Sequence, residues 1–126
     1  MASKTPVLIV GAGPTGLVLA LWLKKKGISF RIVDKSKGPG ETSRAIAVQA
    51  RTLEYYRQLG IADQLLEQGV IADKIRIIRS GKVVAQVVFG EAGKGISPFS
   101  YLLFLAQDIH ERILIAELKK LGVQVE

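Results

Sequence analysis

The sequence contains no cysteine and only one histidine, His110, among its 126 residues. The absence of cysteine excludes disulfides, thiolate nucleophiles, redox dithiols and cysteine-ligated zinc, and it agrees with a reducing, cytoplasmic location. A single histidine excludes a histidine-rich metal site built by this chain alone and disfavours a Ser-His-Asp triad. We therefore expect no metal site and assign no catalytic acid, base or nucleophile. Any redox chemistry has to come from a bound cofactor.

Acidic and aromatic residues are also few. The chain has 11 Asp and Glu against 18 Lys and Arg, a net charge of +7, and 6% aromatic residues. The cations are scattered along the chain, and those at Lys24–Lys26 and Lys119–Lys120 end two apolar segments, where a helix dipole favours positive charge. No aromatic residues alternate with them, as a platform for single-stranded nucleic acid requires. The composition predicts one soluble globular domain that does not bind nucleic acid.

Uncharged residues run from Pro6 to Leu23, a length that could suggest a membrane anchor. Gly11, Gly13, Pro14 and Gly16 interrupt this run. They would break a spanning helix into halves that are too short to cross a bilayer. We therefore expect no membrane span and divide the run into a strand followed by a helix.

The first third of the chain predicts a β-α-β unit. Val7–Val10 is a continuous apolar run, typical of a strand that is covered on both faces in a parallel sheet. The helix expected over Thr15–Lys26 is apolar nearly all the way round, so we expect it to be buried on more than one side. Gly27 stands where a left-handed cap belongs, and Ile28–Val33 predicts the second strand.

The remaining elements follow from turn residues and capping patterns. After the β-α-β unit we expect a loop over Lys35–Ser43, a helix through Arg51–Leu59 closed by Gly60, and a short helix capped by Asp63 and ending at Gln68. A hairpin of Lys74–Arg79 and Lys82–Phe89, joined at Ser80-Gly81, is expected next, followed by a loop over Gly90–Ser100 and a strand over Tyr101–Ala106. The last expected elements are a helix opened by an Asp108–Glu111 capping box and ending at Leu121, and a further strand beginning at Val123–Glu126.

The most informative motif is G-x-G-x-x-G, formed by Gly11, Ala12, Gly13, Pro14, Thr15 and Gly16. It follows a buried strand and opens a helix, which is the context of a dinucleotide-binding fingerprint. The first glycine permits the tight turn, the second lets a pyrophosphate approach the backbone, and the third allows close packing of helix on strand. The helix N-terminus supplies N–H groups and a dipole for the phosphates.

Asp34 ends the second predicted strand, about twenty residues beyond the glycines, where an acid accepts the hydroxyls of an adenosine ribose. Its negative charge disfavours a 2′-phosphate and hence NADP, although Lys35 and Lys37 stand beside it. Lys35 is included among the candidate cofactor-binding residues. The motif and the acid together predict an α/β, Rossmann-like fold with a parallel sheet and an inserted β-hairpin, incomplete at its C-terminus.

Three blocks of sequence resemble the FAD-dependent aromatic hydroxylases of the para-hydroxybenzoate hydroxylase type, the class A flavoprotein monooxygenases. The blocks are V-L-I-V-G-A-G-P-T-G-L with the acid of I-V-D-K, T-S-R-A-I-A-V-Q-A-R-T-L-E-Y-Y-R-Q-L-G-I over Thr42–Ile61, and L-A-Q-D-I-H-E-R-I-L over Leu105–Leu114. They occur in the family's order but match only the N-terminal portion of a family member. The resemblance implies that residues 1–126 are part of a FAD-binding domain whose remainder, with the substrate domain, is absent.

The resemblance also implies roles for individual residues. FAD would place its pyrophosphate on Gly11–Gly16 and its adenosine ribose on Asp34. Arg44 would reach the FAD phosphates, and Gln107 would hydrogen-bond the ribityl or phosphate region. Arg51 is interpreted as structural, and His110 as a surface residue in a first helical turn.

In this family NAD(P)H reduces the flavin, and the reduced flavin activates O₂ to hydroxylate an aromatic ring. The resemblance therefore implies FAD as cofactor, NAD(P)H as transient co-substrate and a small aromatic, phenolic substrate, with residues 74–105 reaching toward the substrate side. The isolated chain is expected to bind FAD at best and to self-associate through apolar surface left uncovered. The alternatives are a non-catalytic dinucleotide-binding module, or part of another FAD oxidoreductase such as an amine oxidase or a halogenase.

Overall fold

The structure, a computed structural model, describes residues 6–40 and 47–126. These residues form two compact units, one of residues 6–40 and 106–126 and one of residues 47–105. The first contains the predicted β-α-β unit, and the second contains the hairpin.

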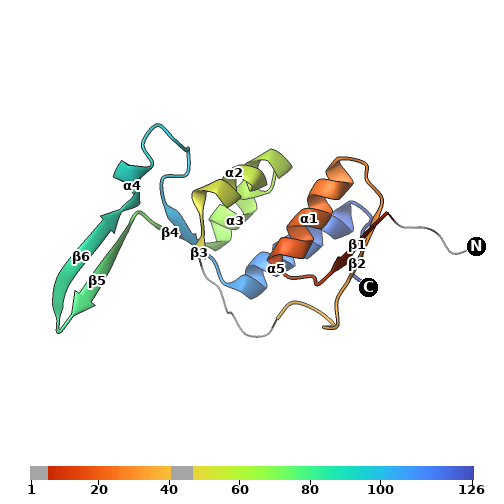
Figure 1. Cartoon of the computed structure of the whole chain (residues 1–126), viewed down its shortest axis with the longest axis horizontal. Helices are drawn as coiled ribbons and strands as arrows, with labels where there is room; N and C mark the ends of the chain where they lie inside the picture. Colours follow the sequence, from red (N-terminus) through yellow and green to blue (C-terminus); the bar gives the residue numbers. More distant parts are fainter. Residues whose placement is uncertain (1–5, 41–46) are drawn as a thin grey trace, which may run out of the picture. The chain divides into compact units, whose positions relative to one another are not determined.

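The first unit consists of two parallel strands and two helices: β1 (Val7–Val10), α1 (Pro14–Lys25), β2 (Phe30–Val33) and α5 (Gln107–Lys120). β1 pairs with β2 in register, Val7 opposite Phe30 and Val10 opposite Val33. Helix α1 packs against both strands and against α5, and the two helices lie side by side in Figure 1. The predicted β-α-β unit is confirmed, with α1 beginning one residue earlier and β2 two residues later than expected.

Helix α1 ends as its sequence predicts. Gly27 has a φ of +67°, a conformation that costs glycine little, and the N–H of Ile28 donates to the carbonyl of Leu23 at 3.0 Å. The buried side chains of the helix lie three and four residues apart on one face: Leu17, Ala20 and Leu21. Leu19 is 45% exposed, so the helix is fully buried along one face and not on every side.

The C-terminal residue continues the parallel arrangement. The N–H of Glu126 donates to the carbonyl of Ile32 at 2.9 Å, and the N–H of Asp34 donates to the carbonyl of Glu126 at 2.8 Å. In a parallel ladder, one residue makes backbone hydrogen bonds to residues i and i+2 of the neighbouring strand, as Glu126 does here with Ile32 and Asp34. Since the carbonyl of Val33 accepts from Gly11 on the other edge of β2, Glu126 lies on the side of β2 opposite β1. Of the strand predicted to begin at Val123–Glu126, this last residue alone makes ladder bonds.

The second unit contains α2 (Ala50–Leu59), α3 (Ala62–Gln68) and a small antiparallel sheet of β3 (Ala47–Val48), β7 (Leu102–Phe104) and β4 (Val70–Ala72), in that order. Its largest fully buried side chains are those of Leu53, Tyr56, Leu65, Phe99 and Leu103. The sequence did not predict β3 or β4, and β7 is shorter than the expected Tyr101–Ala106. Strands of two or three residues are too short to show an alternating pattern.

Helix α2 ends at Gly60 as expected, because this glycine adopts the left-handed conformation with φ +78°. The predicted cap of α3 is wrong. Ile61 is the N-cap residue and Asp63 lies inside the first turn, where its charge still suits the helix dipole.

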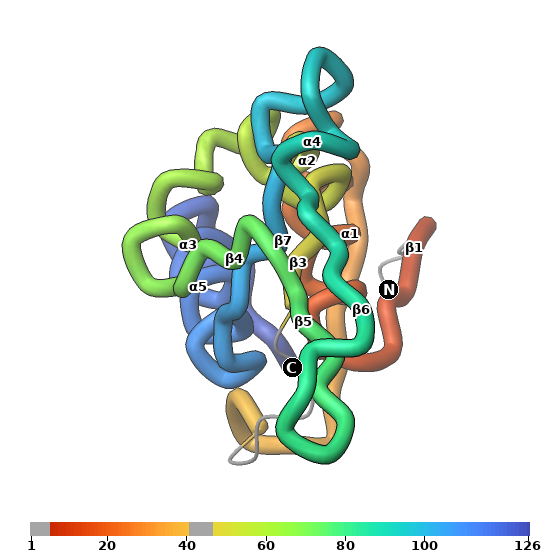
Figure 2. Tube along the Cα trace, turned by 90° about the vertical axis from the view of Figure 1, so that its left-hand side faces the viewer, coloured from red at the N-terminus to blue at the C-terminus, as the bar shows by residue number. Residues whose placement is uncertain are grey.

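The hairpin is confirmed as β5 (Lys74–Arg79) paired with β6 (Lys82–Val88), and Figure 2 shows the two runs of chain side by side up to their turn. Ser80 and Gly81 both have positive φ, 50° and 75°, as in the tight turns that match strand twist. The segment expected to be a loop after the hairpin begins with one short helix, α4 (Phe89–Ala92). The fold class is confirmed as α/β, with a parallel β1-α1-β2 unit and an antiparallel hairpin.

Candidate cofactor site

The loop between β1 and α1 is a tight turn fixed to the neighbouring strand. The N–H of Gly11 donates to the carbonyl of Val33 in β2 at 2.8 Å. Gly13 is the N-cap residue of α1, and Pro14 occupies the first helical position, where the missing N–H of proline costs nothing. The first turn of α1 carries no acidic residue, so its N–H groups and dipole present positive potential.

The three glycines of the motif differ in their surroundings. Gly11 has a φ of +108°, which side chains rarely adopt, and a Cβ on Gly16 would lie 2.0 Å from the carbonyl oxygen of Gly11. Gly13 has an ordinary φ of −74°, and a Cβ on it would meet nothing within 4 Å. The fold therefore requires the first and third glycines but not the second. Gly13 leaves an open approach to the backbone at the helix N-terminus, which suits a phosphate ligand.

Asp34 is tied to this loop through backbone amides. Its Oδ2 accepts a hydrogen bond from the N–H of Ala12 at 2.6 Å, and its Oδ1 accepts one from the N–H of Ser36 at 2.7 Å. These bonds, that from Ala12 above all, hold the pKa of the carboxyl below its usual value, so it is ionised at neutral pH. Each oxygen keeps a second lone pair. The carboxylate can therefore accept two further hydroxyl donors without leaving the loop.

The other candidates divide into those beside Asp34 and those elsewhere. Lys35 follows Asp34 and is exposed, and Thr15 is exposed in the first turn of α1. Arg44 lies outside the described residues. Arg51 contacts Glu54 at 2.8 Å and Tyr55 at 3.2 Å within its own helix, which fits the structural role expected for it.

Gln107 is the first residue of α5, and its side chain is held from within that helix. Its Nε2 donates to Oε1 of Glu111 at 2.7 Å. The other oxygen of Glu111 accepts from the N–H of Gly40 at 3.1 Å. The predicted Asp108–Glu111 capping box is therefore wrong: Ala106 is the N-cap residue without a side-chain cap bond, and Glu111 reaches the loop that follows β2.

His110 is not the surface residue that the sequence suggested. It is 7% exposed, because the helix turns this position inward. Burial lowers the pKa of His110 below its usual value, and the carboxylate of Glu111 opposes this shift. The imidazole is consequently neutral at physiological pH.

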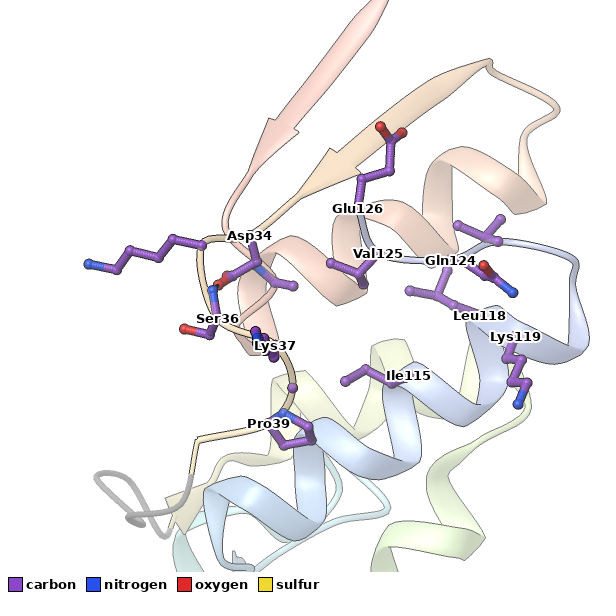
Figure 3. A pocket seen from close by; sticks show the side chains of 14 residues that line it. Asp34, Ser36, Lys37, Pro39, Ile115, Leu118, Lys119, Gln124, Val125 and Glu126 are labelled. Carbon is purple, nitrogen blue, oxygen red and sulfur yellow. Dashed lines mark hydrogen bonds between the residues drawn. The ribbon is translucent and has the colours of Figure 1, made fainter.

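A cavity of about 590 Å³ adjoins Asp34, within the range of small-molecule sites. Figure 3 shows its three walls: the loop after β2 with Asp34 to Pro39, helix α5 with Ile115 and Leu118, and the C-terminal segment with Val125. The sequence interpretation missed this cavity. Ile115 and Leu118 follow the spacing of one helix face, but that spacing indicates a core as readily as a pocket.

Among residues 6–40 and 47–126, no group of three or more His, Cys, Asp or Glu side chains is placed to hold a metal ion. No helix in the same part of the chain is long and apolar enough to cross a membrane. The site therefore offers loop amides, a helix N-terminus, one ionised carboxylate and a cavity with one apolar wall and a polar rim, which together can receive the ADP half of a dinucleotide.

Comparison with known proteins agrees with this chemistry. A family model described as FAD binding domain matches residues 4–126. The chain is 39% identical over 127 residues to the 6-methylpretetramide 4-monooxygenase of Streptomyces rimosus, covering 99% of this chain and 22% of that protein.

Two solved structures are similar across the whole chain. The p-nitrophenol 4-monooxygenase of Pseudomonas putida matches with a TM-score of 0.91 and 25% identity, over 100% of this chain and 32% of that one. Aklavinone-11 hydroxylase, in a ternary complex with FAD and aklavinone, matches with a TM-score of 0.84 and 29% identity, over 100% of this chain and 26% of that one. The chain thus spans between about a fifth and a third of the length of these relatives. Because the family match runs through nearly the whole sequence, the chain belongs to the FAD-binding-domain family and corresponds to the N-terminal part of the FAD-binding domain of class A flavin monooxygenases, the aromatic hydroxylase family.

Proposed function

We propose that this chain binds the ADP half of FAD at the β1–α1 loop. The observation that carries the proposal is Gly13, because neither its φ of −74° nor the packing around it requires a glycine in the folded chain. A ligand that approaches the backbone closely does need one. Gly11, Ala12, Gly13, Pro14, Thr15 and Gly16 would hold the pyrophosphate through loop amides and the N-terminus of α1.

The ribose and adenine would lie beyond the pyrophosphate. Asp34 would accept the ribose hydroxyls on the lone pairs that its bonds to Ala12 and Ser36 leave available, with Lys35 at the rim. The adenine would enter the adjoining cavity, whose apolar wall of Ile115, Leu118 and Val125 suits a flat heterocycle. Gln107 and Arg44 would contact the ribityl and phosphate parts.

A ligand series tests which half of FAD the chain recognises. We expect FAD and ADP to compete for one site and FMN to compete poorly, because FMN lacks the adenosine and the pyrophosphate. The measurement is FAD fluorescence titrated with the purified chain and then displaced by ADP or FMN. Equal displacement by FMN would contradict the proposed placement, and a chain that quenches no FAD fluorescence would contradict binding itself.

For the complete protein we propose hydroxylation of an aromatic, phenolic substrate with NAD(P)H and O₂. When bound, the flavin would accept the hydride and activate O₂, and this chain would bind the adenosine end of the cofactor. Residues 74–105 are proposed to extend toward the substrate side, and residues 1–126 alone are proposed to be catalytically incomplete. Support comes from relatives named as monooxygenases, each far longer than this chain.

The test of this wider proposal is oxygen and NAD(P)H consumption by a longer protein that contains this sequence. We expect phenols to stimulate NAD(P)H oxidation and to yield hydroxylated product. A protein that retains FAD yet consumes no NAD(P)H with any phenol would be a different FAD oxidoreductase. The 126-residue chain serves as the control and should show no turnover.

A further inference from the structure

Glu111 is a buried acidic residue with no role in the function proposed above. It is 5% exposed, and burying a carboxylate is costly unless its oxygens are hydrogen-bonded. Both oxygens are used. Oε1 accepts from the side chain of Gln107 at 2.7 Å, and Oε2 accepts from the backbone of Gly40 at 3.1 Å.

These two bonds join the two ends of the candidate site. Gln107 opens helix α5, while Gly40 ends the described loop that starts at Asp34. Glu111 lies one helical turn beyond Gln107, so its side chain can reach back to that residue. Glu111 thus connects the first turn of α5 to the loop that carries the ribose-binding acid.

The bond also fixes which way the amide of Gln107 faces. Nε2 of Gln107 is the donor to Oε1 of Glu111, so the NH₂ group of the amide faces Glu111. The carbonyl oxygen Oε1 of Gln107 then points away from Glu111. That oxygen can accept a hydrogen bond from a hydroxyl but cannot donate to a phosphate oxygen.

We propose that Glu111 is a positioning residue of the FAD site, a role that rests on the function proposed above. It fixes the amide of Gln107 with the NH₂ group toward Glu111, so that any contact of this amide with the ribityl chain is made through its carbonyl side, and it holds the end of the 34–40 loop. Glu111 itself does not touch the cofactor.

The variant Glu111→Gln tests this role because it preserves size while removing one acceptor. A glutamine has one carbonyl oxygen, so it cannot accept from both Gln107 and Gly40 in the observed arrangement. The matched control is Glu117→Gln on the same helix, where the carboxylate, with its side chain 16% exposed, pairs with the exposed Lys120 at 2.6 Å.

The first readout needs no cofactor. In ¹⁵N-resolved NMR spectra of the chain, we expect Glu111→Gln to shift the side-chain amide signals of Gln107 and to speed hydrogen exchange at Gly40 by about tenfold, the effect of a lost hydrogen bond of about 1.4 kcal/mol. Glu117→Gln should leave both unchanged. If Glu111→Gln is folded and also leaves both unchanged, the positioning role is overturned.

The second readout is FAD affinity in a double-mutant cycle of Gln107→Ala and Glu111→Gln. If Glu111 acts through Gln107, Glu111→Gln weakens FAD binding by about tenfold in the wild-type background and much less when Gln107 is already alanine. Equal losses in both backgrounds would overturn action through Gln107. If the wild-type chain does not bind FAD at all, the proposed function is refuted. The NMR readout, which needs no FAD, still decides in that case whether Glu111 holds Gln107 and Gly40.

Discussion

At the scale of single residues, the three glycines of the β1–α1 loop show how one motif combines folding and binding. Gly11 is needed for its positive φ and Gly16 for its contact with the backbone of Gly11, whereas Gly13 is free of both demands. The sequence alone does not show which glycine is needed for folding and which for binding, because all three positions hold the same residue. The structure distinguishes the two roles, so the effect of substituting each glycine can be predicted.

Gly16→Ala is expected to destabilise the folded chain strongly. Its Cβ would meet the carbonyl oxygen of Gly11 at 2.0 Å and Cγ2 of Ile9 at 3.3 Å, and the backbone oxygen cannot rotate away. Overpacking costs typically about 1–3 kcal/mol, and a contact this short with backbone places the cost at the upper end of that range. Urea unfolding measures the loss. A change of less than about 0.5 kcal/mol, the size of an ordinary surface substitution, would show that α1 is not packed as described.

His110 should make stability depend on pH. Since burial lowers its pKa in the folded chain, the unfolded chain takes up a proton at a higher pH than the folded one does. The stabilisation is complete above the ordinary histidine pKa of about 6.5 and is lost as pH falls through the lower, folded value. The slope is at most about 1.4 kcal/mol per pH unit.

Urea midpoints at several pH values from mildly alkaline down to mildly acidic measure this effect, with His110→Gln as the control. Asp34, Glu54 and Glu126 also have lowered pKa values, but they titrate at lower pH and remain in both proteins. The expected result is a steeper loss of stability in the wild type. The same slope in His110→Gln would contradict a buried, neutral His110.

At the scale of helices and strands, the sequence was most informative where a turn residue closed a long periodic segment. Gly27, Gly60 and the Ser80-Gly81 turn all lie where they were predicted, because positive φ restricts the choice of residue. Helix N-termini were less predictable. Asp63 and Asp108 both resemble caps, yet the caps are Ile61 and Ala106, since a carboxylate in the first turn satisfies the dipole equally well.

The missed features of the site have a common cause. Gly40 and Glu111 are far apart in sequence and meet only after folding, and the cavity beside Asp34 needs three separate segments to enclose it. The contact between Asp34 and the glycine loop was easier to predict from the sequence, because a β-α-β unit brings the end of its second strand beside its first turn.

The β5–β6 turn offers a prediction at this scale. Ser80 has a φ of 50°, which asparagine tolerates better than serine does. We expect Ser80→Asn to stabilise the chain by a few tenths of a kcal/mol, and Gly81→Ala, at φ 75°, to destabilise it by about 1 kcal/mol. Thermal unfolding of both variants measures the pair. A hairpin without this turn geometry would show the reverse order or no difference.

At the scale of the whole molecule, apolar surface is exposed in both units. Val10 of β1 is 80% exposed, and on the hairpin Ile78 and Val83, which are paired across the strands, are 64% and 55% exposed. Patches of this kind favour association. We expect the isolated chain to self-associate, with a sedimentation coefficient that rises with concentration.

The variant that tests this association is Ile78→Thr with Val83→Thr, which keeps β-branched residues in both strands. It should shift the chain toward the monomer in sedimentation velocity runs. A wild-type chain that sediments as a monomer at every concentration would contradict the prediction. An unchanged double variant would place the association elsewhere, with Val10 as the next position to change.

The central claim is that the β1–α1 loop is built to receive the pyrophosphate of FAD, and Gly13→Ala compared with Gly90→Ala tests it most directly. A Cβ at either position meets nothing within 4 Å in the chain itself, so both variants should fold, with Gly13→Ala losing at most about 1 kcal/mol as a weaker N-cap. FAD fluorescence titrations should show binding weakened by tenfold or more in Gly13→Ala, about 1.4 kcal/mol, and unchanged in Gly90→Ala. Equal FAD affinity in Gly13→Ala and the wild type would contradict the claim.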